Sequence, residues 1–211
     1  MSVSGLETLA EKIMARLPEE GRAIIALTGP PGSGKSTCAE SLAGELETLG
    51  RCVQIVPMDG FHLDNRLLEA RGLLPRKGAP ETFDLAGLTH LITRLRSEPV
   101  IIYPLFDRER DIAVAGAGEV SADCDCIIVE GNYLLFDQPG WRELAAFWDV
   151  SIHLAVPEDL LRARLVQRWR DHGLAEEAAQ DRAERNDMAN ARRIFAAALP
   201  ADLTWESING A

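Results

Sequence analysis

Residues 29–37 read Gly-Pro-Pro-Gly-Ser-Gly-Lys-Ser-Thr and directly follow a short apolar run, Ala23–Thr28. This spacing matches the phosphate-binding pattern G-x-x-x-x-G-K-[ST], which needs a strand before the loop and a helix after it. The glycines let successive backbone N–H groups point at phosphate oxygens, and the following helix adds the positive end of its dipole. The stretch therefore predicts an α/β fold and a site for a nucleoside triphosphate.

The same stretch predicts which residues bind the nucleotide. Lys35 can reach the β- and γ-phosphates, and the Ser36 hydroxyl can coordinate Mg²⁺. The sequence lacks the N-K-x-D segment that accompanies guanine specificity in this class of proteins, so ATP is favoured over GTP. The other expected nucleotide contacts are Gly29, Gly32, Ser33, Gly34 and Thr37.

Apolar runs alternate with helical stretches along the whole chain. Continuous apolar runs are typical of parallel strands covered on both faces, so we expect a parallel sheet of about five strands flanked by helices. The expected strands are Ala23–Thr28, Cys52–Val56, Val100–Tyr103, Cys126–Glu130 and Val150–Val156, with a further candidate at Asp202–Trp205. The expected helices are Leu6–Leu17, Lys35–Leu49, Leu85–Arg96, Trp141–Phe147, Glu158–Arg170 and Glu176–Ala198, and the expected surface loops are Gly72–Pro80 and Ala113–Gly118.

Length and composition limit the number of domains and the classes of partner. The 211 residues suit a single domain spanning 1–211, and 26% charged residues are ordinary for a folded chain. A net charge of −11 opposes binding to nucleic acid or an anionic membrane, because both need a positive field. No apolar run is long enough for membrane insertion, and Glu7, Glu11 and Lys12 interrupt any signal-peptide core. We therefore expect a cytoplasmic protein.

Two carboxylates are expected beside the phosphate loop. Asp59 follows the strand Cys52–Val56, and Glu130 ends the strand Cys126–Glu130. Because the carboxyl ends of parallel strands share one edge of a sheet, both side chains should lie near the triphosphate. Phosphoryl transfer needs a metal ion at the γ-phosphate and a group that receives the proton of the acceptor. We expect Glu130 to serve Mg²⁺ and Asp59 to act as the general base.

An arginine-rich helix is a candidate for closing over the phosphates. Residues 162–170 contain four arginines and no acid, and Arg164 and Arg168 are four residues apart, hence on one helical face. Two guanidinium groups on one face suit the dispersed negative charge of a transferring phosphoryl group. The alternative is a solvated helix face that neutralises nearby acids.

Together these motifs resemble the phosphoribulokinase/uridine kinase family of P-loop kinases, which includes bacterial pantothenate kinase. The resemblance covers most of the chain, and within the family it is strongest to the branch named for fructose transport system kinases. It rests on residues 29–37, Met58–His62, Arg76–Asp84, Tyr103–Arg108 and Val129–Gly131.

The resemblance implies roles for particular residues. The general base of the family matches Asp59, and its mobile lid, at about residues 160–185, would add Arg164 and Arg168 to Lys35 as catalytic residues. Residues 59–62 and 103–107 depart from the uridine kinase pattern, so nucleoside specificity does not carry over. Members of the family often form homodimers, which makes a homodimer an expectation here too. The implied acceptor-binding residues are His62, Phe83, Tyr103, Asp107 and Arg108.

The sequence thus predicts an ATP-dependent kinase that phosphorylates a hydroxyl group of a small acceptor. The acceptor would be a sugar, a nucleoside or a related compound, and the resemblance suggests a link to fructose uptake. One alternative is an ATP-binding regulatory module with slow ATPase activity, which would need no base such as Asp59. The other is a nucleotide kinase, which would need Arg76, Lys77 and Arg108 to bind a second phosphate.

Overall fold

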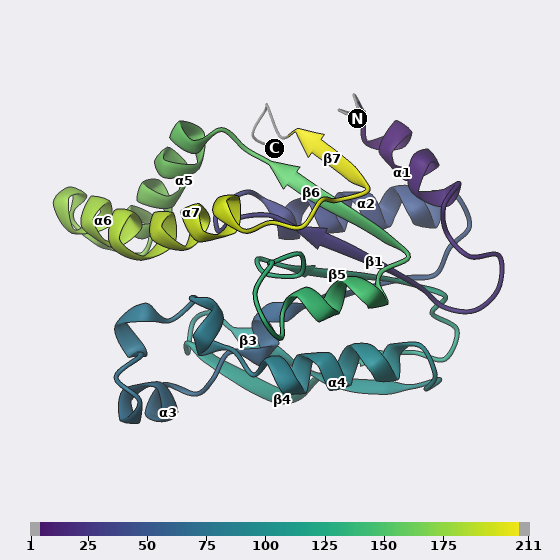
Figure 1. Ribbon diagram of the computed structural model, residues 1–211, viewed down its shortest axis with the longest axis horizontal. Coiled ribbons are helices and arrows are strands. Elements are labelled where there is room, and N and C mark those ends of the chain that lie inside the picture. Colours follow the sequence, from purple (N-terminus) through teal and green to yellow (C-terminus); the bar gives the residue numbers. More distant parts are fainter. Residues whose placement is uncertain (1–4, 207–211) are drawn as a thin grey trace.

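Five parallel strands form the central sheet in a computed structural model that describes residues 5–206 (Figure 1). Their spatial order is β2-β5-β1-β6-β7, so the strand that carries the phosphate loop, β1, lies between β5 and β6. The prediction of a parallel sheet of about five strands is confirmed. The strands are β1 Ala23–Thr28, β2 Val53–Pro57, β5 Cys126–Gly131, β6 Val150–Ala155 and β7 Leu203–Glu206.

Each face of the sheet is covered by its own apolar layer. Alternate residues of a strand point to opposite faces, and β1 shows this with Ile25 and Leu27 on one side and Ile24 and Ala26 on the other. Helices α1 (Leu6–Met14) and α2 (Lys35–Thr48) cover the first side. The second side is covered by α4 (Leu85–Leu95), the 3₁₀-helix η4 (Arg142–Phe147) and a β-hairpin (Figure 1).

The hairpin corrects two predictions. Residues 100–103 do not join the parallel sheet; β3 (Ile101–Asp107) pairs antiparallel with β4 (Ile112–Val120) in a separate two-stranded sheet. Ala113–Gly118 is therefore strand rather than loop. The hairpin buries only one face, through Ile101, Tyr103 and Val120, so its other face can be rich in alanine and glycine without an apolar run.

Short elements fill the chain between β2 and α4 and lie at the carboxyl edge of the sheet. The segment expected as a loop, Gly72–Pro80, contains little regular structure apart from a 3₁₀ turn, as predicted. An isolated β-bridge between His62 and Phe83 joins the two ends of the chain segment between β2 and α4. The elements are η1 Met58–Phe61, α3 Asn65–Ala70, η2 Leu74–Arg76 and η3 Pro80–Thr82.

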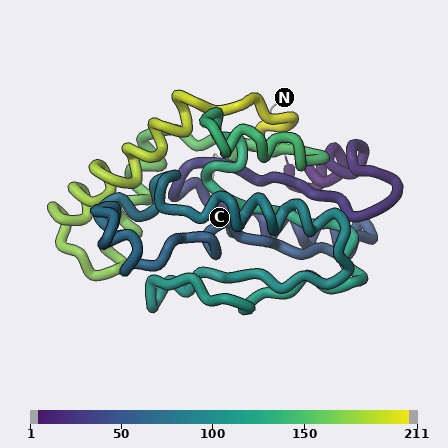
Figure 2. The backbone as a smooth tube through the Cα atoms, turned by 60° about the horizontal axis from the view of Figure 1, so that its bottom comes forward, coloured from purple at the N-terminus to yellow at the C-terminus, as the bar shows by residue number. Residues whose placement is uncertain are grey.

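Four helical segments extend beyond the carboxyl ends of the strands. We call residues 158–196 the lid because they include the region, about 160–185, where a lid is predicted; that they close over the site stays a prediction. The single helix expected at Glu176–Ala198 is divided by a π-helical turn, η5. The lid has an apolar cluster of its own, which includes Leu161, Leu165 and Met188. Figures 1 and 2 both place the lid at the same end of the molecule as the segment between β2 and α4. The segments are α5 Glu158–Asp171, α6 Glu176–Arg182, η5 Ala183–Met188 and α7 Ala189–Ala196.

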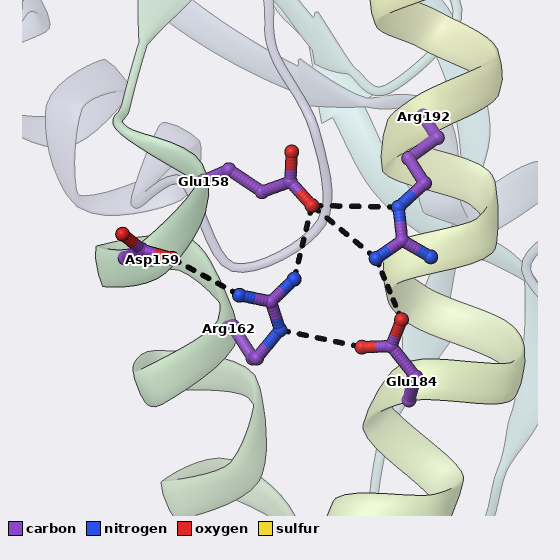
Figure 3. A network of polar contacts seen from close by, with 5 residues as sticks. All are labelled: Glu158, Asp159, Arg162, Glu184 and Arg192. Carbon is purple, nitrogen blue, oxygen red and sulfur yellow. Dashed lines mark hydrogen bonds and ion pairs between the residues drawn. The ribbon is translucent and has the colours of Figure 1, made fainter.

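An ionic network also holds the lid together (Figure 3). Arg162 of α5 pairs with Glu184 of η5 at 3.3 Å, and Arg192 of α7 pairs with Glu158 of α5 at 3.2 Å. Each such pair at the surface contributes little by itself, about 0–1 kcal/mol. Together with the apolar cluster, the network joins α5, η5 and α7 into one unit.

Within residues 5–206, the structure contains no helix that combines the length and apolar character needed to span a bilayer.

Candidate active site

A cavity of about 830 Å³ lies at the carboxyl edge of the sheet, between the phosphate loop, the lid and the β3–β4 hairpin. It is lined by side chains from elements that are far apart in the sequence. Most of the residues singled out from the sequence line it: Gly32, Gly34, Lys35, Ser36, Thr37, Asp59, His62, Arg108, Glu130 and Arg168.

The phosphate loop has the backbone conformation that its glycines permit. Gly32 and Gly34 have φ values of 75° and 90°, in the left-handed region that side-chain-bearing residues rarely adopt. A Cβ at Gly32 would also lie 2.9 Å from Leu165 Cδ2, so the lid packs directly on the loop. Gly29 and Ser33 belong to the loop but do not line the cavity, and Ser33 is fully buried.

Lys35 opens α2 and lies almost fully buried at the base of the cavity. Its Nζ donates a hydrogen bond to the Pro30 carbonyl at 2.9 Å, so the amine is held within the loop. Burial lowers the pKa of Lys35, and the nearby charges of Glu130 and Asp59 oppose this effect. A buried cation at the first residue of a helix is suited to binding phosphate, because the positive end of the helix dipole lies there too.

Ser36 and Glu130 form the candidate metal site. The Ser36 hydroxyl donates to Glu130 Oε1 at 3.1 Å, and Glu130 is only 7% exposed. Burial raises the pKa of Glu130, while the Lys35 charge opposes that shift. Residues 5–206 contain no group of three or more His, Cys, Asp or Glu side chains that could hold a metal ion alone. A hydroxyl and one carboxylate nevertheless fit Mg²⁺, which takes few protein oxygens and completes its shell with water and substrate phosphates.

Asp59, the expected base, lies on η1 and is paired with Arg108. Arg108 Nη2 donates to Asp59 Oδ2 at 3.0 Å, and the two side chains are 55% and 25% exposed. His62 lies next to them, with its Nδ1 2.8 Å from the Asp59 carbonyl oxygen. Because a carbonyl can only accept, Nδ1 carries the proton. Burial lowers the pKa of His62, which favours the neutral ring.

The four arginines of α5 have three different environments. Arg162 and Arg170 pair with carboxylates, Arg162 with Glu158 and Arg170 with Glu176. Arg168 lines the cavity, and its guanidinium makes no ion pair or hydrogen bond to any residue that the structure describes. Arg164 does not line the cavity; its Nη1 donates to the Ser33 carbonyl at 3.3 Å, against the phosphate loop.

Three of the expected acceptor residues lie outside the cavity. Tyr103 is 3% exposed and donates to the Ile55 carbonyl at 3.0 Å. Phe83 is buried beneath His62, with ring centroids 4.1 Å apart, and so supports that ring from below. Asp107 pairs with Arg110 at 2.7 Å on the hairpin turn. None of these three side chains reaches the surface of the cavity.

Sequence reasoning named Lys77 only as a candidate for a second phosphate site and missed the polar cluster that Lys77 forms with Asn65 and Asp111. Lys77 donates to Asn65 Oδ1 at 2.6 Å and pairs with Asp111 at 2.9 Å, and its amine lies 5.0 Å from the centre of the Phe106 ring. All four residues line the cavity. The positions come from three separate elements, so no local spacing in the sequence could have connected them.

The lid contributes further polar residues that were not predicted as site residues. Asp187 accepts a hydrogen bond from the Trp169 indole at 2.6 Å, and Asn186 donates to the Lys77 carbonyl at 2.9 Å. Burial raises the pKa of Asp187. Asn186 and Asn190 are both buried, but their burial is visible only in the structure, so no signal in the sequence pointed to them.

Comparison with known proteins gives a consistent result. A solved structure from Silicibacter sp. TM1040, described as a "putative fructose transport system kinase", is 60% identical, with a TM-score of 0.95 over 96% of this chain and 100% of that one. The Escherichia coli (strain K12) protein YggC is 40% identical over 188 residues, covering 88% of this chain and 78% of YggC. A Schizosaccharomyces pombe protein with the name "Putative uridine kinase C227.14" is 36% identical over 202 residues, which is 89% of this chain and 84% of that protein.

The model of one protein family matches residues 24–194, a range that runs from the first strand of the sheet to α7 and includes every element that lines the cavity. The chain belongs to the phosphoribulokinase/uridine kinase family and is a P-loop kinase.

Proposed function

We propose that this kinase transfers the γ-phosphoryl group of ATP to a hydroxyl group of a sugar or related polyhydroxylated acceptor. The observation that carries the proposal is the position of Asp59, which shares one cavity with Lys35, Ser36 and Glu130. A carboxylate in that position can receive a proton from an organic hydroxyl, whereas a regulatory ATP-binding module needs no such group.

The chain's own residues supply the steps of the reaction. Asp59 takes the proton of the acceptor hydroxyl, whose oxygen forms a bond to the γ-phosphorus. The bond from that phosphorus to the β,γ-bridging oxygen breaks, and its electron pair leaves with ADP. Lys35 and Arg168 balance the negative charge on the transferring group, and positioning with electrostatic stabilisation accounts for most of the catalysis in phosphoryl transfer.

Ser36 and Glu130 would hold Mg²⁺ beside the phosphates. When bound, the ion would neutralise charge on the β- and γ-phosphate oxygens. Glu130 would then have two effects: its carboxylate would contribute an anionic ligand, and its charge opposes the lowering of the Lys35 pKa that burial causes.

The polar residues on one side of the cavity favour a neutral acceptor with several hydroxyl groups. Asn65, Asp111 and His62 offer hydrogen-bonding atoms on one side of the cavity, and the Phe106 ring offers an apolar surface. A nucleotide kinase would need a second phosphate site there. Each of the three residues that would form it is already paired: Lys77 with Asp111, Arg76 with Glu81 and Arg108 with Asp59.

A panel of acceptors tests the proposal. ADP release with ATP and Mg²⁺ is measured with fructose, other sugars and polyols, nucleosides, nucleoside monophosphates and pantothenate, each against ATP alone. We expect at least one sugar or polyol to stimulate ADP release and to gain phosphate, as detected by mass spectrometry. Stimulation by nucleoside monophosphates alone would overturn the proposed acceptor class, and stimulation by none would favour the regulatory module.

Asp59→Asn is the matched variant for this panel. It keeps the size and hydrogen bonding of the side chain but cannot accept the proton, so acceptor-dependent turnover should fall by about 10²–10⁴-fold. ATP binding should not weaken, because Lys35, Ser36 and the loop amides are unchanged. Full acceptor-dependent activity in this variant would contradict the proposed mechanism.

A further inference from the structure

We propose that Arg108 is a catalytic residue that changes its partner during the reaction. It neutralises Asp59 before the triphosphate binds and moves to the transferring phosphoryl group once the triphosphate is bound. This proposal rests on the proposed function, in which Asp59 is the base and ATP the donor.

The backbone that carries Arg108 is anchored on both sides. Before it, the Asp107 carboxylate accepts from the Arg110 backbone N–H at 2.9 Å. After it, Asp111 adopts a φ of 55° and is bound by Lys77 and by the Asn65 amide, the latter at 2.8 Å. The left-handed φ of a non-glycine residue costs free energy, which these contacts offset. The turn therefore holds Arg108 at a fixed place on the rim of the cavity.

The side chain of Arg108, by contrast, is lightly held. It is 55% exposed, and among the described residues its one hydrogen bond is to Asp59, from a single guanidinium nitrogen at 3.0 Å. A guanidinium can form two parallel bonds to a carboxylate or a phosphate, and the bidentate form is stronger and more specific. The pair with Asp59 uses half of this capacity, so a phosphoryl group can compete for Arg108.

Five lysine and arginine side chains line the cavity, and Arg108 is one of three among them whose charges act on one another. Lys35 comes from the start of α2, Arg168 from α5 and Arg108 from the hairpin turn. The charge of Arg108 helps to lower the pKa of both Lys35 and Arg168, so the three groups are electrostatically coupled. Bringing like charges together costs free energy, and attraction to a bound anion would offset that cost. The γ-phosphate is the anion that the proposed reaction brings to this point.

If Arg108 changes its partner in this way, the ability of Asp59 to accept a proton depends on whether ATP is bound. With Arg108 on Asp59, one carboxylate oxygen is engaged and the negative charge is partly neutralised, which makes Asp59 a weaker base. When Arg108 moves to the phosphoryl group, it adds a positive charge where the transition state gathers negative charge, and it frees Asp59 to take the proton. The exchange makes the acceptor site competent only after ATP is in place.

Calorimetric binding without any acceptor tests the proposal. Affinity is measured for Mg²⁺·ADP and for Mg²⁺·ADP with aluminium fluoride, which occupies the place of the transferring phosphoryl group. Arg108→Gln should leave Mg²⁺·ADP affinity unchanged and weaken the aluminium fluoride complex by about 10–100-fold, the loss expected for a hydrogen bond to a charged group. Arg108→Lys should recover part of that loss. Equal effects of Arg108→Gln on the two complexes would overturn the proposal.

Arg110→Gln is the matched control. Arg110 lies on the same turn, carries the same charge, is similarly exposed and does not line the cavity. It should bind both complexes as the wild type does. If it weakens the aluminium fluoride complex as much as Arg108→Gln does, the effect is one of general charge and the proposal fails.

A double-mutant cycle with Asp59→Asn tests the exchange itself. Asp59→Asn should strengthen binding of the aluminium fluoride complex, because Arg108 no longer has to leave a carboxylate, and this gain should shrink in the Arg108→Gln background. Equal gains in both backgrounds would show that Arg108 does not exchange partners. None of these measurements contains an acceptor, so their outcome is independent of the acceptor panel, which tests the proposed function.

Discussion

The Ser36 hydroxyl and the Glu130 carboxylate lie 3.1 Å apart although 94 positions separate them in the sequence. The strand order explains this proximity, because β5, which ends in Glu130 and Gly131, is hydrogen-bonded to β1, which leads into the phosphate loop. Parallel pairing places both ends at one edge of the sheet. Two oxygen ligands of the kind that Mg²⁺ prefers are thereby brought together by topology alone.

Glu130→Gln should raise the Mg²⁺ requirement of the enzyme. The amide keeps the shape of the side chain but loses its negative charge, so the Mg²⁺ concentration for half-maximal ADP release should rise by more than the ~10-fold that loss of an outer-shell partner typically costs. Mg²⁺ titration at saturating ATP measures this. Glu119→Gln, an exposed change on β4, serves as the control. An unchanged Mg²⁺ requirement together with a lost chemical step would mean that Glu130 and Asp59 have exchanged roles.

Arg168→Ala should lower kcat more than it changes the KM for ATP. Arg168 has no counter-charge paired with it among the described residues and lines the cavity, so its interaction is expected to form with the transferring group. Removing one such donor typically costs about 10²–10³-fold in kcat.

Arg164→Ala should have a smaller effect, through the loop contact to Ser33. Arg170→Ala, which removes an exposed ion pair on the same helix, is the control and should leave kcat unchanged. Steady-state kinetics with an acceptor from the panel distinguishes the three. If Arg168→Ala behaves like Arg170→Ala, Arg168 belongs to a solvated helix face.

The sheet could be predicted from the sequence because a local pattern of residues marks its strands. The phosphate loop follows a fully apolar strand, and parallel strands buried on both faces appear as continuous apolar runs. The rule that such strands end at one edge then brings Asp59 and Glu130 to the loop, as the cavity shows. Their chemical roles stay predictions, since geometry alone does not assign them.

The β3–β4 hairpin and the polar cluster beside it could not be predicted in the same way. Tyr103 was expected in the acceptor pocket, but its residue type does not reveal which face of β3 it occupies, and it points into the core. The cluster of Lys77, Asn65 and Asp111 depends on how the hairpin turn meets the segment before α4. This contact depends on packing between residues that are far apart in the sequence, so no local sequence pattern predicts it.

His153→Gln should reduce the loss of stability in mild acid. Burial lowers the pKa of His153 below its ordinary 6.5, with a further contribution from the Lys35 charge. The unfolded chain therefore binds a proton at a higher pH than the folded chain, so the free energy of unfolding falls as the pH drops through 6.5. Urea unfolding of the wild type and the variant at about pH 7.5 and about pH 5.5 measures this slope. An identical slope in the variant would show that His153 does not contribute. His62, whose pKa burial also lowers, should supply part of the slope that remains.

Gly60→Ala should disturb the site through the backbone. Gly60 follows Asp59 on η1, and a Cβ there would overlap the Pro104 carbonyl oxygen of β3 and lie 2.7 Å from the carbonyl carbon. Backbone atoms cannot rotate away as a side chain can, so η1 and β3 must move apart, which separates Asp59 from the strand that leads to Arg108. Overpacking of this kind costs about 1–3 kcal/mol, and for a chain of this size each kcal/mol lowers Tm by roughly 2–4 °C.

Gly44→Ala is the matched control for that substitution. Gly44 lies in α2, is exposed, and has nothing within 4 Å of the position its Cβ would take. Because glycine within a helix is less favourable than alanine by roughly 0.5–1 kcal/mol, Gly44→Ala should raise Tm slightly and leave kcat unchanged. Thermal unfolding and acceptor-dependent kinetics on both variants compare the two sites. If Gly60→Ala matches the wild type in Tm and kcat, the close approach of η1 to β3 does not position Asp59.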